Sequence, residues 1–232
     1  VNELLPRDVV ANAIFAEMKK EGSKHVWLSM APIPEEEIRT HFPNIYQHCL
    51  DEGYAAPKEP MPVVPSQHYF MGGIDVDRYS KTSMERLYAA GETACNGVHG
   101  RNRLASNSTL ECLVFARRAA EYINNNFRNT NGYNFSLPEI KEYNGDVLSD
   151  MQAEEDIATM KKTMSKYVGP LRSREKLEKA LGIFDEICKK YENCKKLSTT
   201  AQNAYSASFV SLIITKEALS RKESIGSHYI VK

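Results

Sequence analysis

The pattern of apolar and polar positions predicts short alternating elements over the first fifty residues. Apolar side chains recur at helical spacing in DVVANAIFAEMKKE (8–21), and Gly22 follows as a helix-ending residue. HVWLSM (25–30) has the composition of a strand. EEEIRTHF (35–42) begins with three carboxylates after a proline, which favours a short helix, and a second short helix is expected over 43–52.

The pattern changes after this region. Residues 57–65 are punctuated by prolines and predict an extended connector. Two strand-like runs follow, SQHYFMGGIDVD (66–77) and ERLYAAGE (85–92), and then a polar loop without periodicity, TACNGVHGRNRLASN (93–107). STLECLVFARRAAEYI (108–123) predicts a helix.

The start of this last helix carries two further signals. Ser108 followed three residues later by Glu111 is typical of a capping box. Leu110, Leu113 and Val114, together with the alanines, are expected to form the buried face.

From about residue 150 the pattern is helical only, and it contains three apolar stripes joined by short polar segments. Gly169 and Pro170 end the first helix, and Ser173 precedes the second. We therefore predict an antiparallel three-helix bundle at the C-terminal end of an α+β chain. The stripes consist of Ile157, Met160, Met164 and Val168; of Leu177, Leu181, Phe184, Cys188 and Tyr191; and of Tyr205, Phe209, Leu212, Ile213 and Leu219.

Composition and charge exclude several classes of protein. The chain is 42% hydrophobic and 26% charged, and thirty basic residues balance thirty acidic ones, which argues against disorder and against nucleic acid as a partner. No apolar run is long enough to span a membrane, and no signal peptide opens the chain. The five cysteines form no CxxC pair, so we expect no metal site, no disulfide framework and a cytoplasmic location.

The polar loop is the best candidate for chemistry. It contains His99, Arg101, Asn102 and Arg103, and it runs directly into a helix N-terminus. Backbone N–H groups and the helix dipole favour negative charge there, and two guanidinium groups would suit a carboxylate or a phosphate. The alternative is that a polar loop simply caps a helix.

Three other residues are candidates, each with a structural alternative. Glu92 closes a strand-like run, where a carboxylate can accept ribose hydrogen bonds, although an isolated Glu is more often solvated. His68 lies between prolines and a Gly-Gly pair, where a lone His is more often structural. Arg7 stands at a helix start, where the dipole disfavours a cation, so a role other than helix stability is one explanation.

Four segments together resemble the fumarate reductase/succinate dehydrogenase flavoprotein family. They are PRDVVANAI (6–14), VVPSQHYFMGGIDVD (63–77), LYAAGET (87–93) and HGRNRLASNSTLECLVFARRAAE (99–121). The similarity covers about residues 1–125, and the HGxNRLASNS loop is highly specific. RKESIGSHY resembles a family segment RxESRGxHY, but Ile225 stands where arginine is usual.

The resemblance implies an incomplete domain organisation. Members of this family begin with a Rossmann-type unit that carries GxGxxG, and this chain contains no GxGxxG. We therefore expect a C-terminal fragment with a partial capping domain (1–69), the returning segment of an FAD-binding Rossmann-like domain (70–138) and a helical domain (139–232). The fragment alone is expected to be inactive and not to retain FAD.

The resemblance also implies site roles. Arg7 would be catalytic, His68 and Arg103 would bind the carboxylates of the substrate, and Glu92, Ser108 and Thr109 would bind non-covalent FAD. Within the family the similarity is greatest to the branch that oxidises L-aspartate to iminoaspartate in NAD biosynthesis. That branch uses oxygen or fumarate as electron acceptor, and the resemblance also implies transfer of the imine to a quinolinate synthase as a partner. The alternatives are a succinate dehydrogenase or fumarate reductase flavoprotein subunit, and a non-enzymatic helical scaffold.

Overall fold

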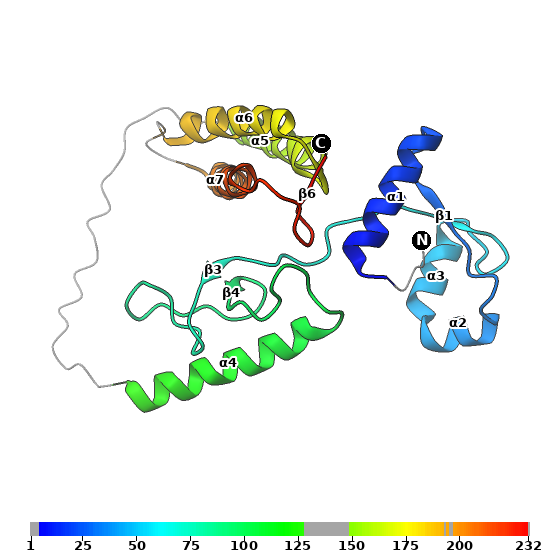
Figure 1. Ribbon diagram of the computed structural model, residues 1–232, viewed down its shortest axis with the longest axis horizontal. Coiled ribbons are helices and arrows are strands. Elements are labelled where there is room, and N and C mark those ends of the chain that lie inside the picture. The colour runs from blue at the N-terminus through cyan, green and yellow to red at the C-terminus, as the bar shows by residue number, and fades with distance from the viewer. Residues whose placement is uncertain (1–4, 128–148, 193, 195–196, 232) are drawn as a thin grey trace. The chain divides into compact units, whose positions relative to one another are not determined.

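The protein is a mixed α+β chain that is mostly helical (Figure 1). The computed structural model describes residues 5–127, 149–192, 194 and 197–231. The chain divides into two compact units, Val1–Tyr69 and Phe70–Lys232. The predicted domain boundary at 138/139 lies outside the described residues. Within the described part of the chain the strands form three two-stranded sheets, and no helix is both long enough and apolar enough to cross a membrane.

The first unit contains the predicted elements in the predicted order. α1 ends at Gly22, whose φ of 64° is left-handed and whose backbone N–H donates to the carbonyl of Met18. β1 and β2 pair antiparallel, so the segment expected to be only a connector contributes a strand. The elements are α1 (Arg7–Glu21), β1 (Val26–Leu28), α2 (Glu35–His41), α3 (Pro43–Asp51) and β2 (Met61–Val63).

The second unit begins with a short parallel pair, β3 (Ile74–Asp75) and β4 (Ala94–Cys95). Gly73 permits the close approach of the two segments, because a Cβ there would overlap the carbonyl oxygen of Thr93. The expectation of a strand over ERLYAAGE is wrong, since Tyr88 forms only an isolated bridge to Lys81. The preceding residues form a tight turn, which leaves too few extended residues for a ladder.

The capping box predicted for the next helix, α4 (Asn107–Asn126), is also wrong. The N-cap is Ser106, which has a φ of 68° and makes no side-chain capping bond. Ser108 therefore lies inside the first turn. Its hydroxyl and the Glu111 carboxylate bond to residues of the preceding loop instead of capping the helix.

The buried face of α4 differs from the predicted one. Its buried residues are Glu111, Phe115 and Ala119, which follow one another at a spacing of four. Ala119 lies on this face as predicted, whereas Leu110, Leu113 and Val114 are 60%, 66% and 43% exposed. The segments before the helix contact its Glu111 and Phe115 side through Ser80, Asn96 and His99.

Three helices make up the C-terminal region, as predicted, and they pack together (Figure 1). The first continues as a π-helical turn, η1, which ends before Gly169. One core cluster joins the beginning of the second helix to the end of the third, and another joins the end of the second to the beginning of the third, so these two run antiparallel. The elements are α5 (Asp150–Thr163), η1 (Met164–Val168), α6 (Arg174–Glu192) and α7 (Thr199–Ser220), with β5 (Leu171–Arg172) parallel to β6 (Tyr229–Ile230).

The packing of α7 corrects another expectation. Phe209 and Ile213 of the predicted stripe are 43% and 47% exposed. Leu212 is buried, and the other buried positions of the helix are all small: Ala201, Ala204, Ser208, Ser211, Thr215 and Ala218. Small side chains let the backbone of α7 approach α5 and α6 closely. The face that carries these small residues is therefore buried, and Phe209 and Ile213 lie at its exposed edge.

Candidate substrate and cofactor site

The polar loop between β4 and α4 is built from tight turns. Gly97 and Gly100 have φ values of 80° and 53°, which glycine adopts without steric cost. Asn96 stabilises the first turn, because its side-chain oxygen accepts from the backbone N–H of Val98 at 3.0 Å. The loop thus connects the end of β4 to the start of α4 over residues 96–106.

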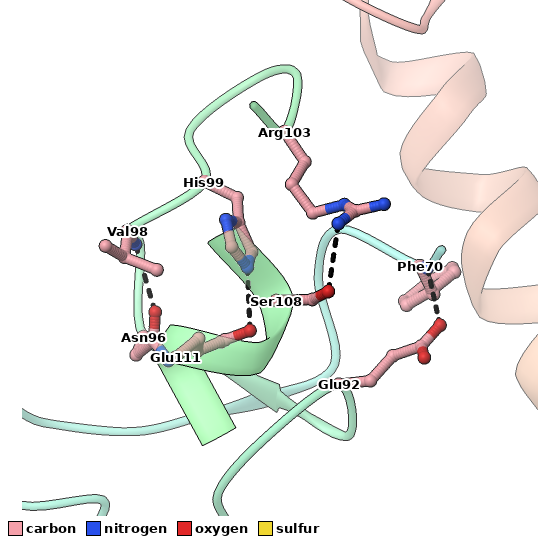
Figure 2. A network of polar contacts seen from close by, with 8 residues as sticks. All are labelled: Phe70, Glu92, Asn96, Val98, His99, Arg103, Ser108 and Glu111. Carbon is pink, nitrogen blue, oxygen red and sulfur yellow. Dashed lines mark hydrogen bonds and ion pairs between the residues drawn. The ribbon is translucent and has the colours of Figure 1, made fainter. Parts of the chain in front are cut away.

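Glu111 holds this loop against the first turns of α4 (Figure 2). Its side chain is 1% exposed, and one oxygen accepts from Asn96 Nδ2 at 2.6 Å. The other oxygen lies 2.7 Å from Nε2 of His99, whose side chain is 8% exposed. A buried carboxylate is tolerated only when polar groups surround it, and the Asn96 amide and the His99 ring supply such contacts here. Helix and loop are therefore joined at two points of the loop.

Arg103 lies at the end of the loop and reaches across the start of α4. Its Nη1 donates to the hydroxyl of Ser108 at 2.9 Å, and both residues are half-buried (Figure 2). This contact orients the planar guanidinium, which carries five N–H donors in a fixed fork. Such a group is suited to bidentate binding of a carboxylate.

The remaining candidates of the second unit lie on nearby segments. Glu92 precedes β4, and its carboxylate accepts from the backbone N–H of Phe70 at 2.7 Å (Figure 2). An ionised carboxylate has further acceptor sites, so this bond leaves room for a ribose hydroxyl. Thr109 is exposed on the first turn of α4, next to Ser108.

Arg7 and His68 belong to the first unit. Arg7 is the first residue of α1, is exposed, and donates from Nη2 to the carbonyl of Leu5 at 2.8 Å. His68 is exposed in the segment after β2. The structure therefore brings together Arg103, Ser108 and Thr109, with Glu92 on an adjoining segment, while the meeting of Arg7 and His68 with Arg103 stays a prediction.

The residues at the start of α4 fit the expected cofactor, FAD. No side chain caps the helix at Ser106, and the first turn contains no acidic residue. The backbone N–H of Asn107 donates to the Leu104 carbonyl at 3.3 Å. The N–H groups that follow it are suited to an anionic or electron-rich group, and the guanidinium of Arg103 next to them adds positive charge. An electron-rich carbonyl edge of the flavin is a group of this kind.

Sequence reasoning missed the Asn96–His99–Glu111 network. The sequence pattern placed Glu111 in a helix cap and gave no role to His99 beyond its place in the polar loop. The available signal was the position of Glu111 on the stripe of Phe115 and Ala119, because a carboxylate on a buried stripe requires a hydrogen-bonding partner.

Comparison with known proteins finds similarity at both ends of the chain. Residues 1–109 match the FAD binding domain, and residues 157–230 match the fumarate reductase flavoprotein C-term. An L-aspartate oxidase of Clostridium perfringens is 60% identical over 124 residues, which are 53% of this chain and 28% of that protein. An L-aspartate oxidase of Acinetobacter baylyi is 40% identical over 237 residues, or 98% of this chain and 42% of that protein.

A solved structure agrees with this similarity. An E. coli quinol fumarate reductase variant superimposes with a TM-score of 0.80 at 25% identity, over 98% of this chain and 43% of the other. The chain spans about two fifths of the length of the relatives that it matches along its whole length.

Proposed function

We propose that this chain, which is similar to the FAD binding domain over residues 1–109 and to the fumarate reductase flavoprotein C-term over residues 157–230, is part of an enzyme that oxidises L-aspartate to iminoaspartate with FAD. The observation that carries the proposal is the arrangement of Arg103 and Ser108 at the uncapped start of α4. It combines a carboxylate-binding fork with a helix terminus suited to the flavin. The identity of 60% to an L-aspartate oxidase supports this substrate over succinate.

We assign the parts of the chain accordingly. Residues 1–69 form the remainder of a capping domain, residues 70–138 form the returning segment of the FAD-binding domain, and residues 139–232 form the helical domain. The absence of GxGxxG from the sequence supports action within a longer chain, because the FAD pyrophosphate requires such a loop or an equivalent one.

Different residues of the chain bind the substrate and the cofactor in this proposal. FAD, when bound, would supply the acceptor for the hydride of the aspartate α-carbon. Arg103 binds one substrate carboxylate through its fork, and His68 donates a hydrogen bond to a carboxylate. The first-turn N–H groups at Ser108 and Thr109 favour negative charge on the reduced cofactor, and Glu92 accepts from its ribose.

Arg7 has the most demanding role in this proposal. Arg7 either transfers a proton at the reacting carbon or stabilises the charge that develops there. It can lose its own proton only transiently, because the pKa of arginine exceeds about 12.

The further steps concern the products. Oxygen or fumarate takes the electrons, and the unstable imine passes to a quinolinate synthase. We propose a reducing compartment such as the cytoplasm, consistent with five cysteines that are all free thiols.

The test uses the FAD-loaded, full-length protein that contains this chain. Under anaerobic conditions, saturating L-aspartate should bleach the oxidised flavin in a single turnover, and succinate should not. Bleaching by succinate alone would assign the protein to the dehydrogenase branch of the family. An unchanged flavin with both substrates would contradict the enzyme proposal.

A further inference from the structure

A small hairpin near the C-terminus follows α7 and leads into β6. Ile225 and His228 form its two backbone bonds, from Ile225 N to His228 O at 2.7 Å and from His228 N to Ile225 O at 3.0 Å. Gly226 at its tip has a φ of 55°. The hairpin is therefore a defined turn rather than a loose tail.

His228 ties the hairpin to the helical domain. Its side chain is 5% exposed, and Nδ1 lies 2.7 Å from Nη1 of Arg172. Arg172 in turn donates from Nε to the carbonyls of Val168 and Gly169, at the end of η1. Because arginine can only donate, Nδ1 of His228 accepts and the ring is neutral. The hairpin is thus hydrogen-bonded to β5 and, through Arg172, to the end of η1.

The tip of the hairpin lies directly on the polar loop. The backbone N–H of Ser227 faces the carbonyl of Arg101 at 3.4 Å. A Cβ on Gly226 would overlap that carbonyl oxygen, so the contact leaves no space for any side chain at this position. Arg101 stands two residues before Arg103 and two residues after His99.

The loop is consequently held at two places by two different segments. The buried Glu111 carboxylate fixes it at Asn96 and His99, and the hairpin fixes it at the Arg101 carbonyl. Arg103 follows immediately, and its guanidinium reaches Ser108. Without the second contact, the three residues between His99 and Arg103 would have more freedom to move the guanidinium.

We propose that the hairpin 225–228 is a positioning element for Arg103, with Gly226 and His228 as positioning residues. The helical domain thereby holds the substrate-binding arginine in place from the other end of the chain. The proposal rests on the proposed function, in which Arg103 binds the substrate carboxylate. A misplacement of about 1 Å at such a group can cost about a hundredfold in rate.

The experiment compares two glycine-to-alanine variants of the FAD-loaded, full-length protein. Gly226→Ala adds a methyl group against the Arg101 carbonyl. Gly22→Ala is the control, because Gly22 has a similar φ of 64° and nothing lies within 4 Å of its added Cβ. Both variants carry the same backbone strain, and only the first disturbs the loop.

We expect Gly226→Ala to raise KM for L-aspartate by about 10- to 100-fold while FAD content stays at the parent level. Amide hydrogen exchange in residues 98–104 should become faster, a readout that does not depend on turnover. Gly22→Ala should match the parent in KM and in loop exchange. Equal KM and equal loop exchange in the two variants would overturn the proposal.

A second pair of variants, at His228, tests the same proposal if Gly226→Ala does not fold. His228→Leu removes the acceptor for Arg172, whereas His228→Gln keeps a side-chain oxygen that can accept. We expect His228→Leu to raise KM and loop exchange and His228→Gln to restore most of both. Parental values in both variants would contradict the proposal. If the parent protein itself does not oxidise aspartate, the proposed function fails, while loop exchange still tests the hairpin.

Discussion

Arg103 shows how one residue depends on its neighbours for its chemistry. Its charge alone would attract a carboxylate. The hydrogen bond to Ser108 and the contacts that hold the polar loop also fix the orientation of the guanidinium. Lysine has the same charge without the planar fork, so the two side chains are not equivalent at this position.

Arg103→Lys in the full-length enzyme should therefore retain FAD and lose most of its turnover of L-aspartate. We expect a decrease of about a hundredfold in kcat/KM, the size that small misplacements of bound groups produce. Steady-state kinetics with flavin content measured on the same sample provide the check. Parental kinetics would exclude Arg103 as a substrate ligand.

His228 adds a pH dependence at the residue scale. Burial lowers the pKa of this imidazole, and the positive charges of Arg172 and Arg221 lower the pKa further. The unfolded chain then binds a proton near pH 6.5 that the folded chain does not bind, so stability falls as the pH falls below about 6.5.

We expect the melting temperature to decrease between about pH 6.5 and pH 5, and the decrease to be smaller in His228→Gln. The exposed His48 offers a control, since His48→Gln should keep the slope of the parent. Thermal melts over a pH series measure this slope. Identical slopes in all three proteins would mean that His228 does not contribute.

At the scale of elements, the three C-terminal helices show that the core is made by contacts across helices. Phe184 of α6 is fully buried and belongs to the same cluster as Leu212 of α7 and Met160 of α5. At the other end of the bundle the Tyr191 hydroxyl donates to Asp156 at 2.7 Å, which joins α6 to α5. Burial, this hydrogen bond and the Asp156 charge all raise the pKa of Tyr191, so it stays protonated as the donor.

Phe184→Ala should lower the free energy of unfolding of the helical region by about 3–5 kcal/mol, because it leaves a cavity in the main core cluster. Phe209→Ala is the matched control: the ring is 43% exposed, and its removal should cost much less. Urea unfolding followed by circular dichroism distinguishes the two. Equal losses would show that the cluster does not form in solution.

At the scale of the whole molecule, the cofactor site draws on segments that this chain only partly provides. The start of α4 fits an electron-rich flavin edge, but the sequence contains no glycine-rich loop for the pyrophosphate. In the proposed function, the described residues therefore contribute to the orientation of FAD more than to its affinity.

We expect the 232-residue polypeptide, purified by itself and mixed with FAD, to leave gel filtration without a flavin absorbance band. The physical reason is that the diphosphate carries most of the charge of FAD and finds no cradle of backbone N–H groups. The full-length protein is the control and should retain the band. Co-elution of FAD with the short chain would show that α4 and its loop suffice.

The sequence by itself determined the local elements of this protein. The helices at 7–21 and 174–192 follow from apolar spacing and from the residues that end them, Gly22 in the first case. The sequence also singled out the HGRNRLASNS loop as the candidate site, because a dense polar motif at a helix start is a local feature. Helical periodicity and turn residues act over a few positions, so a single segment contains all the information they need.

The tertiary structure alone decided which faces are buried and which polar groups meet. Leu110 is exposed while Glu111 beside it is buried, and α7 packs through small residues rather than through Phe209. The hairpin at Gly226 lies against Arg101, more than a hundred residues earlier in the chain. The physical reason is that a side chain is buried only where another segment packs against its face of the helix or strand. That segment comes from a distant part of the chain, and no local pattern encodes its approach.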